Sequence, residues 1–161
     1  MKKMILMAVA AFTAMSCGGQ SGEKYQEIAG LDTPEGVAGV ALSQVVAENE
    51  YTLLDFWASW CAPCMGEVPF LTEAYAQYKP KGFEIYGVSY DQDGEAWRAA
   101  IADNGMNWVH VSALKGWDCP TAALYGVRSI PRNMLIDKKG NIVAENLRGE
   151  ALAAKLAELL K

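Results

Sequence analysis

The chain of 161 residues has the length of one ordinary domain, and with 52% hydrophobic residues it can bury its own core, which excludes an intrinsically disordered protein. The formal charge is −5, and it becomes −7 without the first 16 residues, which carry two lysines and no acidic residue. This acidic balance argues against a nucleic-acid partner, and against binding to anionic lipid through protein charge alone.

Residues 1–16 have the pattern of a leader peptide. Two lysines precede an apolar stretch that is too short to span a bilayer as a helix. The stretch ends in Thr-Ala-Met-Ser-Cys17, and small residues before a cysteine resemble a bacterial lipoprotein box, although Ala14 stands where a leucine is usual. We predict a lipoprotein signal peptide over 1–16 and a lipidated Cys17, with an ordinary secretory leader as the alternative. Either leader takes the protein out of the cytoplasm.

Residues 17–35 are predicted to form a tether and an irregular lead. The stretch 18–24 is polar and rich in glycine, as is typical of flexible linkers. We expect a strand pair over 36–42, followed by a short helix that Ser43 caps and that ends at Glu48. The folded domain is therefore placed at 36–161.

The stretch Leu53–Cys64 organises the rest of the chain. An apolar, aromatic-rich run with one carboxylate predicts a buried strand over 51–58, and helical spacing of apolar residues predicts a helix from Cys61 to Tyr78. Cys61 therefore lies where a strand ends and a helix begins. There, unpaired backbone N–H groups and the helix dipole stabilise a thiolate, the nucleophile of disulfide exchange. Because only two residues separate it from Cys61, Cys64 can close a disulfide with Cys61 or resolve a mixed one.

Further elements follow the same alternation of strand and helix patterns. A short loop and helix are expected over 116–125 and a hairpin turn over 138–141. The expected strands are 83–90, 108–112, 134–137 and 142–145, and the expected helices are 95–104 and 150–161.

The motif Phe-Trp-Ala-Ser-Trp-Cys-Ala-Pro-Cys at 56–64 closely resembles the active site of thioredoxin-fold oxidoreductases. Glu67 and Pro69 follow this motif, and with them the chain is similar to the membrane-anchored TlpA/ResA branch. The similarity extends from about Gly36 to the end of the chain. The resemblance implies an α/β fold, a thioredoxin-like three-layer sandwich with a mixed central sheet and helices on both faces. It also implies a thiol–disulfide oxidoreductase that needs no cofactor.

Asp55 and Glu67 are the candidate acid–base residues. Thioredoxins have an aspartate beneath the disulfide at the place of Asp55, where burial raises the pKa and lets the carboxylate take the proton of the resolving thiol. Glu67 lies three residues after Cys64, at the place of an acid–base glutamate in the TlpA/ResA type. The alternatives are a hydrogen-bonded core aspartate and a glutamate that only complements the helix dipole.

Ile130-Pro131 is the second element that the resemblance places at the site. The thioredoxin fold keeps a cis proline here that faces the disulfide, and Ile130 would then bind an extended substrate peptide as an added strand. Trp60 is expected to form a wall of the same substrate pocket. Arg132 stands where the family usually has a small residue, and it is either solvated or placed beside the thiolate.

His110 and Cys119 are the remaining residues with metal or redox chemistry. His110 is the only histidine, and we interpret it as structural. Cys119 is either a small buried residue or a third redox thiol. A zinc site at Cys61 and Cys64 would need two more ligands, and the chain has no second Cys-x-x-Cys, so no metal is expected.

These observations predict an exported, lipid-anchored reductant of protein disulfides. Its substrates would be oxidised thiols of extracytoplasmic proteins, such as apocytochrome c, and a transmembrane electron donor would recharge it. Ala62-Pro63 between the cysteines favours a reductant, since strong oxidants place there a histidine that stabilises the thiolate.

Two other functions stay open on this fold. A thiol peroxidase needs a Pro-x-x-x-Thr-x-x-Cys setting, which Cys61 lacks. A copper chaperone would use Cys61, Cys64 and His110 as ligands, although known chaperones on this fold have a Cys-x-x-x-Cys spacing.

Overall fold

The computed structural model describes residues 23–161, so the predicted signal peptide and Cys17 lie outside the described residues. From residue 42 onward, the chain alternates helices and strands in the order that the sequence predicts. In chain order these are α1 (Leu42–Glu48), β1 (Tyr51–Trp57), α2 (Ala62–Tyr78), η1 (Lys79–Lys81), β2 (Phe83–Ser89), α3 (Gly94–Asp103), β3 (Val109–Ser112), η2 (Gly116–Asp118), α4 (Pro120–Leu124), β4 (Arg132–Asp137), β5 (Ile142–Glu145) and α5 (Glu150–Leu159), where η marks a short 3₁₀ helix.

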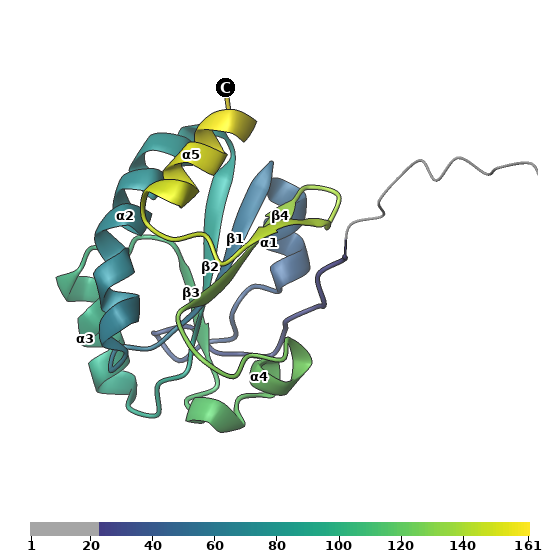
Figure 1. Cartoon of the computed structure of the whole chain (residues 1–161). Coiled ribbons are helices and arrows are strands. Elements are labelled where there is room, and N and C mark those ends of the chain that lie inside the picture. Colours follow the sequence, from purple (N-terminus) through teal and green to yellow (C-terminus); the bar gives the residue numbers. More distant parts are fainter. Residues whose placement is uncertain (1–22) are drawn as a thin grey trace, which may run out of the picture.

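The strands form one mixed sheet in the order β3-β2-β1-β4-β5. β1, β2 and β3 run parallel, and β4 and β5 pair antiparallel at the other side. β1 lies in the middle and is buried at every position after Tyr51, because helices cover both faces. Figure 1 shows α2 and α5 together on one face, and α1 and α4 on the other. The predicted three-layer sandwich is confirmed.

The strand pair expected over 36–42 is wrong. Instead, Asp32 forms isolated bridges with Ala38 and Ser112, and the chain between them turns. Gly39 passes so close to the edge of the sheet that a Cβ there would lie 2.6 Å from Val111 Cγ1. The segment therefore runs as a loop against β3, held by single bridges.

The start of α1 also differs from the prediction. The helix begins at Leu42, and Gln44 Oε1 accepts a hydrogen bond from the Ala41 N–H at 3.1 Å. Ser43 therefore lies inside the first turn and is not the cap. Its N–H instead donates to Glu27 Oε1 at 3.1 Å, which ties α1 to the lead.

The irregular lead packs against the domain from its first described residues. Ile142 N–H donates to Glu23 O, and the side chains of Ile28 and Leu31 are buried in the core. Apolar burial of this kind stabilises the lead against the sheet, so its contacts extend the folded unit ahead of residue 36.

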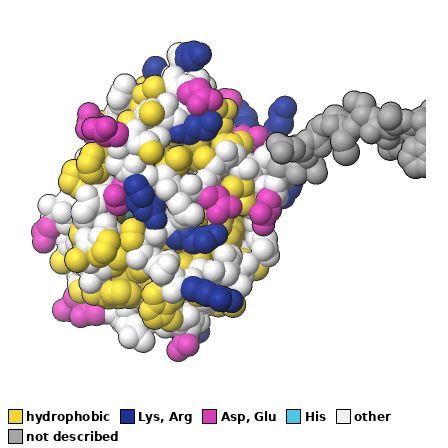
Figure 2. Space-filling model, viewed as in Figure 1, with side chains coloured by type: hydrophobic (Ala, Val, Ile, Leu, Met, Phe, Trp, Pro, Cys, Tyr) yellow, Lys and Arg dark blue, Asp and Glu magenta, His cyan; other side chains and the backbone are white. Residues whose placement is uncertain are grey.

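Within residues 23–161, no helix combines the length and apolar character that crossing a membrane requires. On the face shown in Figure 2, acidic and basic side chains are interspersed. That face does not present the continuous basic patch of a nucleic-acid-binding surface.

Candidate active site

Cys61 and Cys64 form a disulfide at the start of α2, with their Cα atoms 5.2 Å apart. Cys61 is the N-cap residue, and its Sγ accepts a hydrogen bond from the Cys64 N–H at 3.2 Å. The first turn of α2 carries no acidic residue that would compete with a Cys61 thiolate for the positive end of the helix dipole. Once reduced, a Cys61 thiolate therefore meets free N–H donors and the positive end of the helix, which both stabilise its negative charge.

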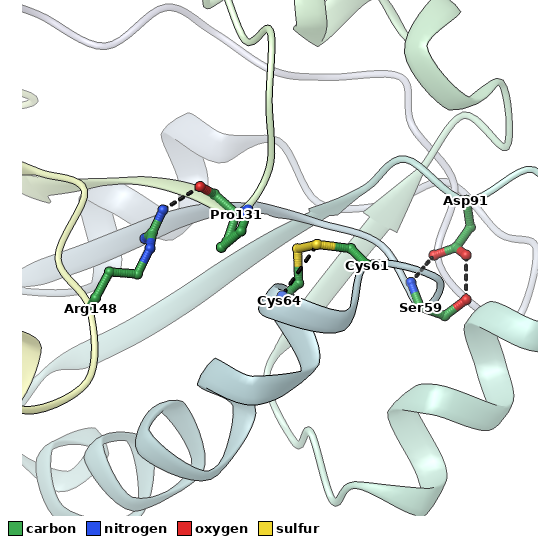
Figure 3. Close-up of a disulfide and its surroundings, with 6 residues drawn as sticks. All are labelled: Ser59, Cys61, Cys64, Asp91, Pro131 and Arg148. Carbon is green, nitrogen blue, oxygen red and sulfur yellow. Dashed lines mark hydrogen bonds between the residues drawn. A yellow bond between two sulfur atoms is a disulfide. The ribbon is translucent and has the colours of Figure 1, made fainter.

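The loop that leads into Cys61 is held by Asp91, a buried carboxylate that the sequence did not single out. Asp91 accepts hydrogen bonds from the N–H and the hydroxyl of Ser59, at 3.0 and 2.5 Å (Figure 3). It also accepts one from the Ser89 hydroxyl at 2.6 Å. It lies two residues after the end of β2, and the carboxyl ends of the parallel strands β1 and β2 meet at one edge of the sheet. That adjacency was the signal that could have found it.

Asp55 lies in the central strand β1 and is buried. Burial raises the pKa of its carboxyl from the ordinary 3.8 to about 7; the positive charge of Arg148 opposes the rise and the negative charge of Glu67 adds to it. At neutral pH such a group exists in both protonation states, which suits a proton acceptor. Asp55 is thus buried in its strand and its pKa is raised, as the sequence predicts, while its acid–base role stays a prediction.

Glu67 makes a contact that the sequence did not predict, and its acid–base role stays a prediction. Its Oε2 accepts a hydrogen bond from the Gly149 N–H at 2.8 Å, and Gly149 is the N-cap residue of α5. The carboxylate therefore joins α2 to the start of α5, where negative charge is favourable. Its influence on the pKa of Asp55 shows that it also belongs to the electrostatic surroundings of the site.

The peptide bond between Ile130 and Pro131 is cis, and Pro131 faces the disulfide (Figure 3). Trp60 is 56% exposed and Trp117, from η2, is 45% exposed, with 6.5 Å between their ring centroids. These rings form an exposed aromatic surface next to Cys61. Sequence reasoning missed Trp117, because its contact with Trp60 joins two distant loops.

Arg132 does not lie free beside the disulfide. Its Nη2 forms an ion pair with Glu145 Oε2 at 3.1 Å across β4 and β5. The cation at the site is instead Arg148, which sequence reasoning overlooked. Arg148 donates from Nη2 to the Pro131 carbonyl and from Nη1 to Leu147 O, the latter at 3.2 Å.

His110 and Cys119 are both buried. His110 Nε2 lies 3.0 Å from Met106 O, its ring packs against Trp57, and burial lowers its pKa to about 4. Cys119 Sγ lies 3.2 Å from Thr121 Oγ1 and behaves as a small core residue. In the described part of the chain, no three Cys, His, Asp or Glu side chains are grouped to hold a metal, so the copper ligand set with His110 is wrong.

The residues 49–142 match a family model described as thioredoxin-like. The chain belongs to this thioredoxin-like family. Within it, the chain is 32% identical over 162 residues to the thiol-disulfide oxidoreductase ResA of Bacillus cereus, an alignment that covers 98% of this chain and 90% of the relative. It is 35% identical to ResA of Bacillus thuringiensis over 108 residues, which span 60% of that relative.

Solved structures agree with this assignment. The thioredoxin domain of a thiol-disulfide oxidoreductase from Bacteroides vulgatus has a TM-score of 0.78 and 33% identity, covering 89% of this chain and all of that domain. A thiol:disulfide interchange protein from Bacteroides sp. has a TM-score of 0.75 and 33% identity, covering 88% and 90%. This thioredoxin-like protein is therefore a thiol–disulfide oxidoreductase of the ResA type, with Cys61 and Cys64 at disulfide distance.

Proposed function

We propose that the protein is an extracytoplasmic, lipid-anchored reductant of protein disulfides. The observation that carries this proposal is the Cys61–Cys64 disulfide at the start of α2. It is supported by Asp55 in the preceding strand, where burial raises the pKa of the carboxyl to about 7. This arrangement supplies a nucleophile, a resolving thiol and a proton acceptor without any cofactor.

The reaction starts from the reduced protein. The Cys61 thiolate attacks one sulfur of a substrate disulfide, the substrate S–S bond breaks, and its second sulfur leaves as a thiolate that takes a proton from water. The Cys64 thiol then gives its proton to the Asp55 carboxylate and attacks the Cys61 sulfur, so that the bond between Cys61 and the substrate breaks and the substrate sulfur leaves as a thiolate that takes a proton from water. The substrate leaves with two electrons gained, and the protein keeps the Cys61–Cys64 disulfide seen in the structure.

The substrate would bind over the disulfide as an extended peptide. The backbone of Ile130 offers it a strand partner, while Pro131 faces the disulfide and Trp60 forms an exposed apolar wall. Glu67 acts on this site through its charge beside Asp55.

The charges of the site favour a reductant over a strong oxidant. A histidine stabilises the nucleophilic thiolate in strong oxidants, but His110 is buried, tied to Met106 and neutral at physiological pH. Asp55 and Glu67 add negative charge, which disfavours a thiolate. The reduction potential should therefore lie nearer to that of thioredoxin, about −270 mV, than to that of DsbA, about −120 mV.

The partners follow from this direction of electron flow. A reductant outside the cytoplasm must be recharged, so we propose a transmembrane electron donor, and Cys17 would hold the protein at the membrane through lipid. The proposed substrates are oxidised protein thiols, with the cysteine pair of an apocytochrome c as one candidate.

Two measurements test the proposal. Cys64→Ser should accumulate mixed disulfides with extracytoplasmic proteins, while the Cys61→Ser control, in which the proposed nucleophile is gone, should trap none. Equilibration with a glutathione buffer, read by tryptophan fluorescence, should give a potential near −270 mV. A value near −120 mV, or turnover that persists in Cys61→Ser, would overturn the reductant assignment. A peroxide-consumption assay then distinguishes a protein-disulfide reductant from a thiol peroxidase.

A further inference from the structure

The loop between β5 and α5 is held against the active site by paired hydrogen bonds. Leu147 N–H donates to Asn133 Oδ1 at 2.9 Å, and Asn133 Nδ2 donates back to Leu147 O at 2.8 Å. One residue further on, Gly149 N–H donates to Glu67 Oε2. Arg148 lies between these two residues, so hydrogen bonds of both chain neighbours hold its backbone in place.

The Arg148 side chain points from this loop toward the substrate-binding proline. Its guanidinium donates to the Pro131 carbonyl, and Figure 3 shows Pro131 between Arg148 and the disulfide. The side chain is partly buried. Within residues 23–161, no carboxylate oxygen lies within 4.0 Å of its guanidinium, so no ion pair neutralises its charge directly.

Asp55 is the buried acid on which this charge acts. In the sheet, Asp55 pairs with Asn133 on β4 and with Gly87 on β2, which are both uncharged. His110 lies one strand beyond Gly87 and is neutral at physiological pH. The charged groups that act on Asp55 are therefore Glu67 from α2 and Arg148 from the loop before α5.

We propose that Arg148 is a positioning residue of the redox site: its guanidinium holds the Pro131 carbonyl of the substrate-binding loop and supplies the positive charge that keeps Asp55 available as a proton acceptor. The inference rests on the proposed reaction, in which Asp55 takes the proton of Cys64. A cation stabilises the carboxylate form, and a guanidinium keeps its charge at every accessible pH. Without it, Asp55 stays protonated to higher pH and cannot accept that proton.

The test is a carbon-13 NMR titration of the Asp55 carboxyl in the oxidised protein, with the signal assigned by its loss in Asp55→Asn. The oxidised protein has no reactive thiol at the site, so this measurement is independent of any activity. Arg148→Met removes charge and hydrogen bond, Arg148→Gln keeps only a donor, and Arg148→Lys keeps the charge. Arg98→Met is the matched control, because Arg98 also donates to a proline carbonyl, that of Pro34, but lies on α3.

The Asp55 midpoint should lie near 7 in the unchanged protein and rise by about one pH unit in Arg148→Met and Arg148→Gln, the lower end of the effect of a nearby opposite charge. Arg148→Lys and Arg98→Met should leave it within about 0.3 units. An unchanged midpoint in Arg148→Met and Arg148→Gln would overturn the electrostatic role, whether or not the protein proves to be a reductase. If Arg148→Met fails to fold, Arg148→Gln decides alone.

The second measurement is the pH profile of disulfide reduction. The rate of Arg148→Met should fall at pH 7 and recover at higher pH, with the midpoint moved as in the titration. In an Asp55→Asn background, adding Arg148→Met should cause no further shift in the midpoint of the pH profile. A pH-independent loss of rate in Arg148→Met would show a structural role alone and refute the proposal.

Discussion

Replacing Asp55 by Asn should make the protein more stable, and increasingly so as the pH rises. In the unfolded chain the carboxyl ionises near 3.8, whereas in the folded protein burial holds its pKa at about 7. Between these values the unfolded state has released a proton that the folded state still binds, so the free energy of unfolding falls with rising pH. Above pH 7 both states are ionised and the fall stops.

The magnitude follows from the size of the rise in pKa. One pKa unit corresponds to about 1.4 kcal/mol, so a rise of about three units costs the folded protein about 4 kcal/mol between pH 4 and pH 8. The amide of Asn does not ionise. The stability gain of Asp55→Asn over the unchanged protein should therefore grow by about 4 kcal/mol across this range, with most of the growth complete by pH 7.

The assay is urea unfolding of the oxidised proteins at half-unit steps of pH, followed by tryptophan fluorescence. Asp103→Asn, at the exposed end of α3, is the control and should reproduce the pH dependence of the unchanged protein because it leaves the Asp55 carboxyl in place. A stability difference between Asp55→Asn and the unchanged protein that stays constant from pH 4 to pH 8 would refute the raised pKa, and with it the acid–base role.

Three further outcomes are expected. Glu67→Gln keeps an oxygen for the Gly149 N–H but removes a negative charge, so the Asp55 midpoint in the NMR titration should fall; a rise would contradict the assigned direction. Trp117→Ala should raise the KM for a protein disulfide about fivefold, matching about 1 kcal/mol of aromatic contact, while turnover of a small disulfide stays unchanged; equal effects on both substrates would argue against a docking role. Cys17→Ala should release an active protein from the membrane fraction, and a mature N-terminus at another residue would rule out the lipid anchor.

The predictions that succeeded from sequence concern residues close together in the chain. The motif Trp60-Cys61-Ala62-Pro63-Cys64 determines its own geometry, since a strand, a two-residue spacer and a helix start are local features. Burial of Asp55 follows in the same way from its position within an apolar run.

The failures at the N-terminal side have a different cause. Residues 36–42 have a strand-like pattern, but the sheet edge at β3 forms only one bridge to this part of the chain, from Ser112 to Asp32, and Asp32 forms the other with Ala38. Strand formation needs a partner with free backbone groups along its length, and local propensity does not reveal whether one is present.

What only the tertiary structure decided is the set of charges and polar contacts around the disulfide. Asp91 reaches Ser59 across 32 residues, Gly149 reaches Glu67 across 82, and Arg148 reaches Pro131 across 17. By their local sequence pattern, Asp91, Arg148 and Gly149 are ordinary loop or turn residues. Their roles arise because parallel strands end at one edge of the sheet and α5 packs beside α2, so the sequence determined the redox pair and the fold determined the electrostatic field in which it works.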